Sequence, residues 1–483
     1  MKKAELVFVP VAFRGHLVST VEFAKRLIQR DDRFSVTILS INSPFGPDAH
    51  GYNKSHLAFE PGLRLIDLPP QDPPPPHLKK SIAQFLSVYI ESYIPHVKDA
   101  IINLKSTRPL AGVVLDFVCI SMIDVANELG LPSYLFLTSG AALVSLMLYL
   151  PTRHTQISAA FEDADPELVI PGFINPVPVS VLPEALRDKH GGYASFIKVA
   201  QRFREAKGII INTFTELEPF LVGSFSDGQA PPVYTVGPVL DLEGQAHSSA
   251  DRADHDKVMA WLDTQPESSV MFLCFGSLGT FDVPQVREIA LGLERSGHRF
   301  LWSLRRPPPD GKFGSPSEGT NLDEMLPEGF MERIGGKGMI CGWAPQVKVL
   351  AHEAIAGFVS HCGWNSILES VWNSVPIVTW PLYAEQKLNA FEMVKELGLA
   401  VEMRLDSRYD GDVVMAEEID GAVRRVMKAD STVRKMVKEM GEKSRRALTE
   451  GGSSYNSFER LIHAMINTRD CAILNVWKYD HVI

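Results

Sequence analysis

The chain has 483 residues, of which 45% are hydrophobic and 22% are charged, and its formal net charge is −10. These values are typical of soluble globular proteins, and five cysteines without a C-x-x-C pair exclude a disulfide scaffold and favour a reducing compartment. The acidic balance disfavours nucleic acid as a partner, and an anionic substrate would need a local source of positive potential.

Short apolar runs alternate with helical patterns in the first half of the chain. Strands are predicted at residues 6–13, 34–39, 112–116 and 133–137, and helices at 20–30, 82–104 and 123–129. This alternation is typical of a parallel sheet with helices on both faces. Residues 1–240 are therefore predicted to form one doubly wound α/β domain.

A polar, acidic segment without periodicity follows, and residues 241–254 are predicted to be a linker. A second series then predicts strands at 270–275, 299–304, 338–340, 357–360 and 377–379, and helices at 283–296, 366–372, 385–397 and 416–428. The second doubly wound domain is therefore expected at residues 255–455. Residues 456–483 begin with an amphipathic helix at 457–466, which is expected to pack back across the domains.

Two polar residues follow or end strands of the first domain, where ligands of open α/β sheets bind. His16, with Gly15, lies between the first strand and the first helix, and Asp116 ends the strand at 112–116. A carboxylate on one ring nitrogen of a histidine raises the basicity of the other, so the pair is a candidate base. The alternatives are a structural histidine and an aspartate that caps the following helix.

A denser cluster follows the strand at 357–360. A tight turn at 361–365 leads into a helix opened by Ser366, and a helix N-terminus at a strand end is a ready anion site. Ser366 and Glu369 also fit a capping box, which is their structural interpretation. At the end of the first strand of the second domain, the small residues Gly276 and Ser277 would let backbone N–H groups approach a phosphate.

Several chemistries are disfavoured by missing motifs. No G-x-G-x-x-G follows either first strand and no P-loop is present, which disfavours nicotinamide enzymes and excludes P-loop kinases. No apolar run is long enough to span a membrane. The D-x-D pairs lie in polar segments rather than at strand ends, so no metal site is expected; they are Asp163/Asp165, Asp254/Asp256 and Asp410/Asp412.

Residues 343–386 read WAPQVKVLAHEAIAGFVSHCGWNSILESVWNSVPIVTWPLYAEQ. This segment closely resembles the signature box of plant secondary-product glycosyltransferases, which use UDP-sugars and adopt the GT-B fold of two Rossmann-like domains facing a cleft. The resemblance covers essentially the whole chain. Further landmarks are the Gly15-His16 and Asp116 strands, residues 275–277 and residues 261–263.

The resemblance implies a role for each matching residue. Trp343 would stack on the uracil, Gln346 and Glu369 would hold the ribose, and His361 would hold the diphosphate together with Ser277. Trp364, Glu385 and Gln386 would contact the sugar, with Thr138 reaching it from the first domain. The full UDP-sugar site implied is Ser277, Trp343, Ala344, Gln346, His361, Trp364, Asn365, Ser366, Glu369, Glu385, Gln386 and Thr138.

The predicted function is inverting transfer of glucose from UDP-glucose to a hydroxyl of a small lipophilic acceptor, a phenolic such as a flavonoid or a terpenoid. His16 would be the general base, assisted by Asp116, without metal or cofactor. In this family a final Gln, here Gln386, goes with glucose as the donor. The acceptor pocket is expected around Phe13, Gly15, Phe117, Leu143 and Tyr383.

Some positions depart from the family pattern. Glu385 stands where Asp is commoner, Val18-Ser19 stands where Pro is frequent, and residues 470–483 look unlike the usual ending. Membrane-bound animal relatives carry a C-terminal span that is missing here, so a cytoplasmic enzyme is expected, acting as a monomer. Two alternatives stay open: another UDP-sugar, acceptor class or reaction on the same fold, and a non-catalytic UDP-sugar-binding protein.

Overall fold

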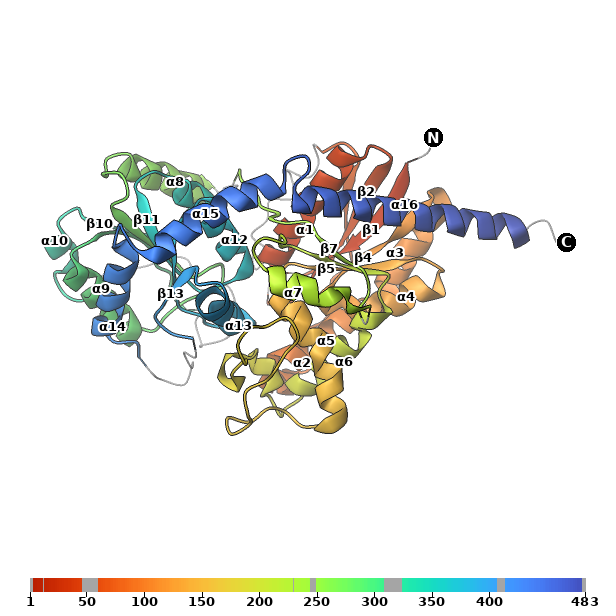
Figure 1. Cartoon of the computed structure of the whole chain (residues 1–483), viewed down its shortest axis with the longest axis horizontal. Helices are drawn as coiled ribbons and strands as arrows, with labels where there is room; N and C mark the ends of the chain where they lie inside the picture. The colour runs from red at the N-terminus through yellow and green to blue at the C-terminus, as the bar shows by residue number, and fades with distance from the viewer. Residues whose placement is uncertain are drawn as a thin grey trace.

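The computed structural model describes residues 3–11, 13–45, 60–228, 230–243, 249–307, 324–405 and 413–479. These residues form two lobes, each built on a parallel sheet (Figure 1). The strand order is β3-β2-β1-β4-β5-β6-β7 in the first sheet and β10-β9-β8-β11-β12-β13 in the second. In each sheet the first three strands are added toward one edge, and the later strands are added on the other side of the first strand. This change in the order of the strands is the doubly wound arrangement predicted from the sequence.

The first domain has seven strands with helices on both faces of the sheet. Its strands are β1 (Ala4–Val9), β2 (Phe34–Ser40), β3 (Leu63–Asp67), β4 (Leu110–Asp116), β5 (Ser133–Leu137), β6 (Gly208–Ile211) and β7 (Val233–Thr235). Its helices are α1 (Arg14–Arg30), α2 (Ile82–Glu91), α3 (Ile94–Thr107), α4 (Ile123–Glu128), α5 (Ala141–Gln156), α6 (Gly192–Arg202) and α7 (Pro219–Ser224). Every residue of β1, β2, β5 and β6 is buried, as expected for strands covered on both faces.

Two predictions for this domain were wrong in detail. Helix α1 begins at Arg14, so Gly15 and His16 lie in its first turn and not in a loop before it. The extended Phe13 serves as the N-cap, and a glycine in the first turn does not prevent the helix from starting there. The helix expected at 82–104 is two helices, and Pro95 lies in the first turn of α3, where a proline costs a helix least.

The second domain has six strands: β8 (Val270–Cys274), β9 (Arg299–Ser303), β10 (Gly338–Cys341), β11 (Ile355–Ser360), β12 (Ile377–Thr379) and β13 (Ala400–Glu402). Its helices are α8 (Ser249–Leu262), α9 (Val283–Ser296), α10 (Phe330–Ile334), α11 (Gln346–Leu350), α12 (Trp364–Trp372), α13 (Gln386–Phe391), α14 (Ala416–Met427) and α15 (Thr432–Ala447). A π-helical turn, Glu392–Glu396, continues α13. Helix α8 begins at Ser249, inside the segment 241–254 that was predicted to be a linker. The first turns of this helix are polar and lack an apolar periodicity, so the sequence pattern did not indicate a helix there.

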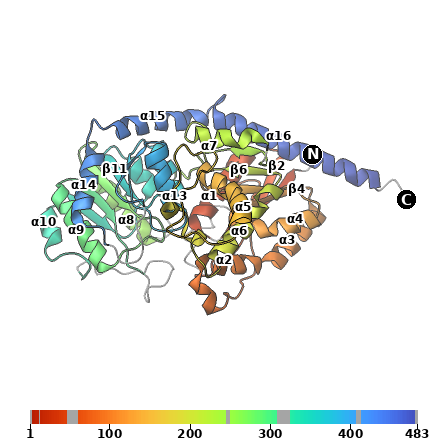
Figure 2. The same ribbon diagram turned by 60° about the horizontal axis from the view of Figure 1, so that its bottom comes forward.

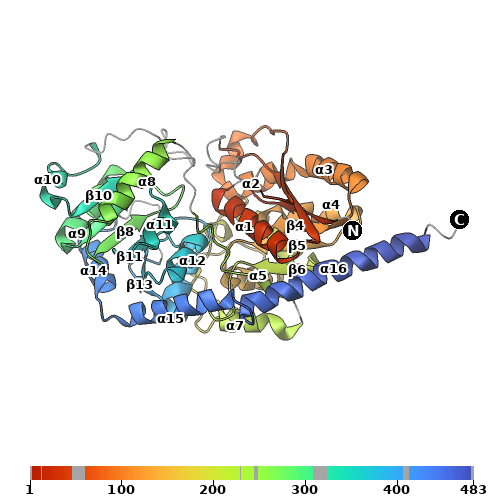
Figure 3. The same cartoon turned by 90° about the horizontal axis from the view of Figure 1, so that it is seen from above.

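Helix α16 (Ser453–Tyr479) joins the two domains from outside. After α15 on the second domain, the chain returns along the first domain (Figures 2 and 3). Four apolar side chains on α16 are buried in the first domain, as predicted for a crossing helix: Phe458, Leu461, Ile462 and Met465. Arg30 of α1 stacks over the ring of Tyr455 at 3.4 Å. Among the residues described, no helix is both long and apolar enough to cross a membrane.

Candidate active site

A large cavity of about 1170 Å³ lies between the carboxyl ends of strands from the two sheets. Ligands of open α/β sheets bind at this edge. Every residue predicted for the UDP-sugar site and the acceptor pocket lines this cavity, and so does His16. Asp116 alone among the predicted site residues does not line it, because it lies behind His16.

His16 and Asp116 form the pair that the sequence predicted. The Nδ1 atom of His16 lies 2.6 Å from Oδ2 of Asp116, whose side chain is 1% exposed, whereas that of His16 is 25% exposed. The other carboxylate oxygen accepts the N–H of Val118 at 3.0 Å, so Asp116 caps the following turn as well. The carboxylate keeps the proton on Nδ1, which leaves Nε2 of His16 as the basic nitrogen.

The surroundings of His16 determine its basicity. Burial lowers the pKa of His16, but the charge and hydrogen bond of Asp116 outweigh burial, so that the pKa is raised above the ordinary value, with a smaller contribution from Glu385. The rings of Phe13 and Phe117 flank the imidazole with centroids at 6.1 and 6.2 Å. The hydroxyl of Thr138, expected to reach the sugar, lies 3.1 Å from Nδ1 of His16.

Helix α12 begins two residues earlier than predicted. Gly363 is its N-cap and no side chain caps it, so the capping box expected for Ser366 and Glu369 is wrong. Instead, Nε2 of Gln346 donates to Oγ of Ser366 at 2.8 Å and to Oε2 of Glu369 at 2.6 Å. Burial raises the pKa of Glu369 to about 7, although the hydrogen bond from Gln346 opposes the shift.

His361 follows β11 and is 7% exposed. Burial, with a smaller effect of the charge on Arg305, lowers the pKa of His361 to about 4, so the ring is neutral at neutral pH. A Cβ atom at Gly276 or Gly363 would clash with the ring, which explains why both turns carry glycine. Nδ1 of His361 is buried and has no hydrogen-bond partner among the residues described.

The start of α12 also bonds to the first domain, and α1 and α12 lie next to each other where the lobes meet (Figure 3). Nδ2 of Asn365 donates to the carbonyl of Gly15 at 3.0 Å, and Oγ of Ser19 donates to Oδ1 of Asn365 at 3.1 Å. The indole of Trp364 donates to the carbonyl of Asn212 at 2.7 Å, and the residue is 2% exposed. The indole N–H of Trp364, the residue expected to contact the sugar, therefore forms part of the domain contact, and Trp364 also lines the cavity.

Glu385 and Gln386 begin α13, and neither caps it in the way that a first-turn acid would. Glu385 is the N-cap residue without a side-chain cap bond, and its Oε1 lies 3.4 Å from Oγ of Ser139 in the first domain. Oε1 of Gln386 accepts the N–H groups of Leu382 and Tyr383 at 2.9 and 3.0 Å. Gln386 thus fixes the turn that carries its neighbour.

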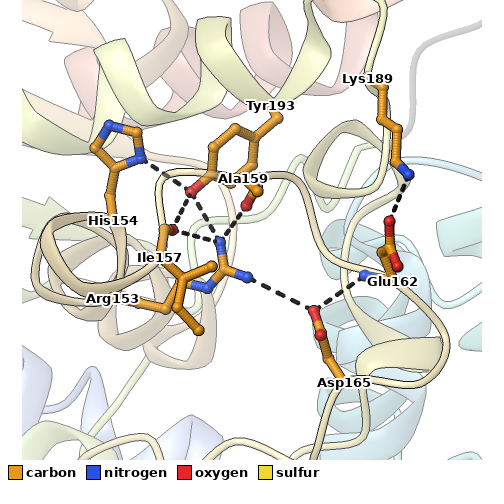
Figure 4. A network of polar contacts seen from close by, with 8 residues as sticks. All are labelled: Arg153, His154, Ile157, Ala159, Glu162, Asp165, Lys189 and Tyr193. Carbon is orange, nitrogen blue, oxygen red and sulfur yellow. Dashed lines mark hydrogen bonds and ion pairs between the residues drawn. The ribbon is translucent and has the colours of Figure 1, made fainter.

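The acceptor end of the cavity is mostly apolar. The predicted residues are joined by Phe45, Leu86, Phe196 and Val199, which sequence reasoning missed because they come from distant segments without a shared motif. Another part of the wall is formed by Pro183, Glu184, Ala185 and Asp188. Arg153 anchors the loop before them, since its Nη1 donates to the carbonyl of Ile157 and to the hydroxyl of Tyr193, each at 3.0 Å (Figure 4).

Among the D-x-D pairs, Asp163 and Asp165 each lie beside an arginine, and Asp256 lies 3.0 Å from Nδ1 of His255. Asp163 pairs with Arg187 and Asp165 lies 3.6 Å from Arg153, while Asp410 and Asp412 lie outside the described residues. No group of three or more His, Cys, Asp or Glu side chains that could hold a metal ion occurs in the part of the chain that the structure describes.

Residues 196–437 match the family described as UDP-glucoronosyl and UDP-glucosyl transferase. UDP-glycosyltransferase 71K1 of Malus domestica is 56% identical over 478 residues, which cover 96% of this chain and 99% of the relative. Flavonol 3-O-glucosyltransferase UGT71C4 of Arabidopsis thaliana is 48% identical, with coverage of 96% and 98%.

Solved structures agree with this similarity. Medicago truncatula UGT71G1 complexed with UDP-glucose has a TM-score of 0.88 and 50% identity, covering 96% of this chain and 98% of its own. Phytolacca americana UGT2 complexed with UDP-2fluoro-glucose and pterostilbene has a TM-score of 0.83 and 32% identity, with coverage of 96% and 99%.

Proposed function

This chain belongs to the UDP-glucoronosyl and UDP-glucosyl transferase family, and from that premise we propose that it transfers glucose from UDP-glucose to a hydroxyl of a small phenolic acceptor of the flavonoid type. The resemblance to plant UDP-glycosyltransferases and the GT-B fold expected from the sequence are confirmed. The donor and acceptor class rest on relatives named flavonol and flavonoid glucosyltransferases and on the similar structure complexed with UDP-glucose.

One observation carries the proposal. The imidazole of the His16–Asp116 pair and the N-terminus of α12 line the same cavity, and the two helices that carry them are joined by the bond between Asn365 and Gly15. A general base beside a phosphate-binding helix suits the transfer of a sugar from a nucleotide diphosphate to a hydroxyl group. The apolar acceptor end suits an aromatic skeleton.

The proposed reaction inverts the anomeric carbon. The acceptor oxygen attacks the anomeric carbon of glucose from the face opposite the diphosphate, the bond to the phosphate oxygen breaks, and UDP leaves with its electron pair. The acceptor proton passes to Nε2 of His16, and Asp116 stabilises the resulting imidazolium. A phenol has a pKa of about 10 and an ordinary histidine about 6.5, so proton transfer accompanies the attack rather than preceding it.

The donor end would bind the nucleotide through residues of the second domain. Trp343 would stack on uracil, and Glu369 would accept the ribose hydroxyls in competition with its bond from Gln346. The N–H groups at the start of α12 would hold the diphosphate. Glu385 would accept sugar hydroxyls, and Gln386 would act mainly by fixing the turn that carries it, since its carbonyl oxygen already has two partners.

The test is product formation by the purified protein. We would incubate it with UDP-glucose and a panel of flavonols, simple phenols and terpenoid alcohols, and identify glucosides by mass spectrometry and their anomeric configuration by proton NMR. A β-glucoside of a phenolic, formed from the α-linked donor, is expected. UDP binding without turnover on any acceptor would instead indicate a non-catalytic UDP-sugar-binding protein, and an α-glucoside would contradict inversion.

A further inference from the structure

Arg305 is a cation in the cavity that the proposed mechanism leaves without a role. It lies two residues after β9, at the carboxyl edge of the second sheet, and lines the same cavity as His361 and Ser277. Nη1 donates to the carbonyl of Ser277 at 3.0 Å, and Nη2 donates to the carbonyl of Gly276. A guanidinium has five N–H donors, so these two bonds leave capacity for a further acceptor.

Arg305 is partly buried, and among the described residues it has no carboxylate partner. It forms no ion pair with any residue that the structure describes, and the groups that interact with it electrostatically include the thiols of Cys274 and Cys341, the phenol of Tyr383 and the imidazole of His361, none of them a carboxylate. Burial lowers the pKa of Arg305. Because charges held away from water are usually paired, this arrangement suits a cation whose partner is a bound anion.

The charges around the cavity make this cation important. The described residues of its lining include six carboxylates and three cationic side chains, Arg14, Lys80 and Arg305, of which only Arg305 belongs to the second domain. The carboxylates are Glu184, Asp188, Asp241, Asp282, Glu369 and Glu385. His361 is neutral at neutral pH. A diphosphate bound at α12 therefore needs a positive charge that the histidine does not supply.

The bonds of Arg305 also orient the turn after β8. In a trans peptide the C=O and N–H groups point in opposite directions, so carbonyls that face the guanidinium turn the N–H groups of Ser277 and Leu278 away from it. Ser277 and Leu278 both line the cavity. Successive N–H groups in a turn with a left-handed residue form a concave anion site, and Gly276 has a φ of +74°.

We propose that Arg305 is a donor-binding residue, which offers its remaining N–H groups to the diphosphate of the UDP-sugar while holding the Gly276–Ser277 turn against the same group. This inference rests on the proposed function, since it assumes that the cavity binds a UDP-sugar. It predicts that the affinity for phosphate-bearing ligands depends on Arg305, whereas the affinity for the nucleoside does not.

The experiment measures binding, not turnover. We would determine the dissociation constants of UDP and of uridine by calorimetry for the parent, Arg305→Met and Arg306→Met. Arg306 is the matched control, because it is the next residue along the chain, pairs with Glu324 at 2.7 Å and does not line the cavity. Arg305→Met should weaken UDP binding roughly 10- to 100-fold, the range for lost charge-assisted bonds, with uridine unchanged.

Each outcome has a defined meaning. Unchanged UDP binding in Arg305→Met, or equal weakening of UDP and uridine, overturns the assignment, and so does an equal loss in Arg306→Met. If Arg305→Met does not fold, Arg305→Gln, which can still donate to one carbonyl, gives the same comparison. A parent that does not bind UDP overturns the proposed function itself, which separates the two failures.

Discussion

Replacing Glu369 with glutamine tests how the cavity recognises the ribose. Glu369 lies on α12, and burial raises its pKa to about 7 from 4.5, with the charge of Asp241 adding to the shift and Gln346 and Arg14 opposing it. In the proposed site the carboxylate would accept hydrogen bonds from both ribose hydroxyls, whereas the protonated form would keep a donor where an acceptor is needed. Donor binding should therefore favour the ionised form.

The size of the effect follows from the titration. With a pKa of about 7, roughly a tenth of the free protein has Glu369 ionised at pH 6 and roughly nine tenths at pH 8. If only that form binds the ribose well, the dissociation constant of UDP-glucose falls about 10-fold between these pH values. Glu369→Gln cannot titrate, so its dissociation constant should be independent of pH over the same interval.

Calorimetry with UDP-glucose and no acceptor is the suitable assay. UDP itself is unsuitable, because its terminal phosphate titrates near pH 6. His361 does not interfere, since its pKa of about 4 keeps it neutral throughout. Asp116 raises the pKa of His16 above the ordinary value, so His16→Ala is the control for its titration and should keep the slope. A flat profile in the parent, or an equal slope in Glu369→Gln, would refute the reasoning.

Further predictions concern the catalytic pair, a buried carboxyl group, the sugar and metal. His16→Ala should lose roughly 10²–10⁴-fold in kcat on a phenol, with the dissociation constant of UDP-glucose unchanged; retention of a tenth of the activity would contradict the assignment. Asp116 raises the pKa of His16, so turnover should rise with pH through a pKa above 6.5, and Asp116→Asn should move this limb of the kcat profile to lower pH. Burial, then the charge of Glu218, raises the pKa of Glu392 well above 4.5, so its contribution to stability is lost as pH rises above that value. Glu392→Gln should then have a higher Tm than the parent at pH 8 and a smaller difference at pH 5; the same difference at both pH values would contradict the raised pKa of Glu392. Glu385→Ala should reduce kcat/KM for UDP-glucose and the preference over UDP-galactose by roughly 5- to 150-fold, and a variant that only melts earlier would show a structural role. Glucosylation should survive EDTA, and rescue of a lost activity by Mn²⁺ would contradict the metal-free site.

Elements with strong local signals were predicted to the residue. Helix α9 begins after Asp282, whose side chain accepts the N–H of Gln285, and ends at Gly297, whose φ is +68°. Strand β5 is a short apolar run that starts after Pro132 and that the structure buries completely. In such places the cap or the breaker is itself part of the sequence pattern, so neither boundary depends on tertiary contacts.

Helix α15 was not predicted, and part of its buried face is made of small residues. The helix is rich in lysine and arginine, and the residues it buries are Val437, Gly441, Ser444 and Ala447. A side chain at Gly441 would collide with Ser374, so the helix packs there by close approach. Val433, Val437 and Met440 pack on the core of the second domain at helical spacing, so the sequence does contain the periodic signal of a helix.

The two ends of the site differ in how far sequence could describe them. Most of the predicted donor residues lie in the one segment from Trp343 to Gln386, so a single motif identifies them. The acceptor wall comes from separate segments such as those of Phe45 and Phe196, and no spacing links them. Arg305 was overlooked for a related reason, because only the fold brings the residues after β9 next to those after β8.

The placement of the base relative to the donor depends on contacts that no motif encodes. Gly15 and Asn365 are 350 positions apart, yet their hydrogen bond joins the helix that carries His16 to the helix whose N-terminus would hold the diphosphate. Ser139 and Glu385 make a second contact of this kind, from the residue beside Thr138 to the predicted sugar site. Each end of the reaction therefore lies within one or two residues of a bond between the domains. A shift of one domain would move the base away from the anomeric carbon, and misplacement by about 1 Å can cost 10²-fold in rate. The chemistry is thus specified by residues within each domain, whereas the alignment of base and donor is specified by the domain contact.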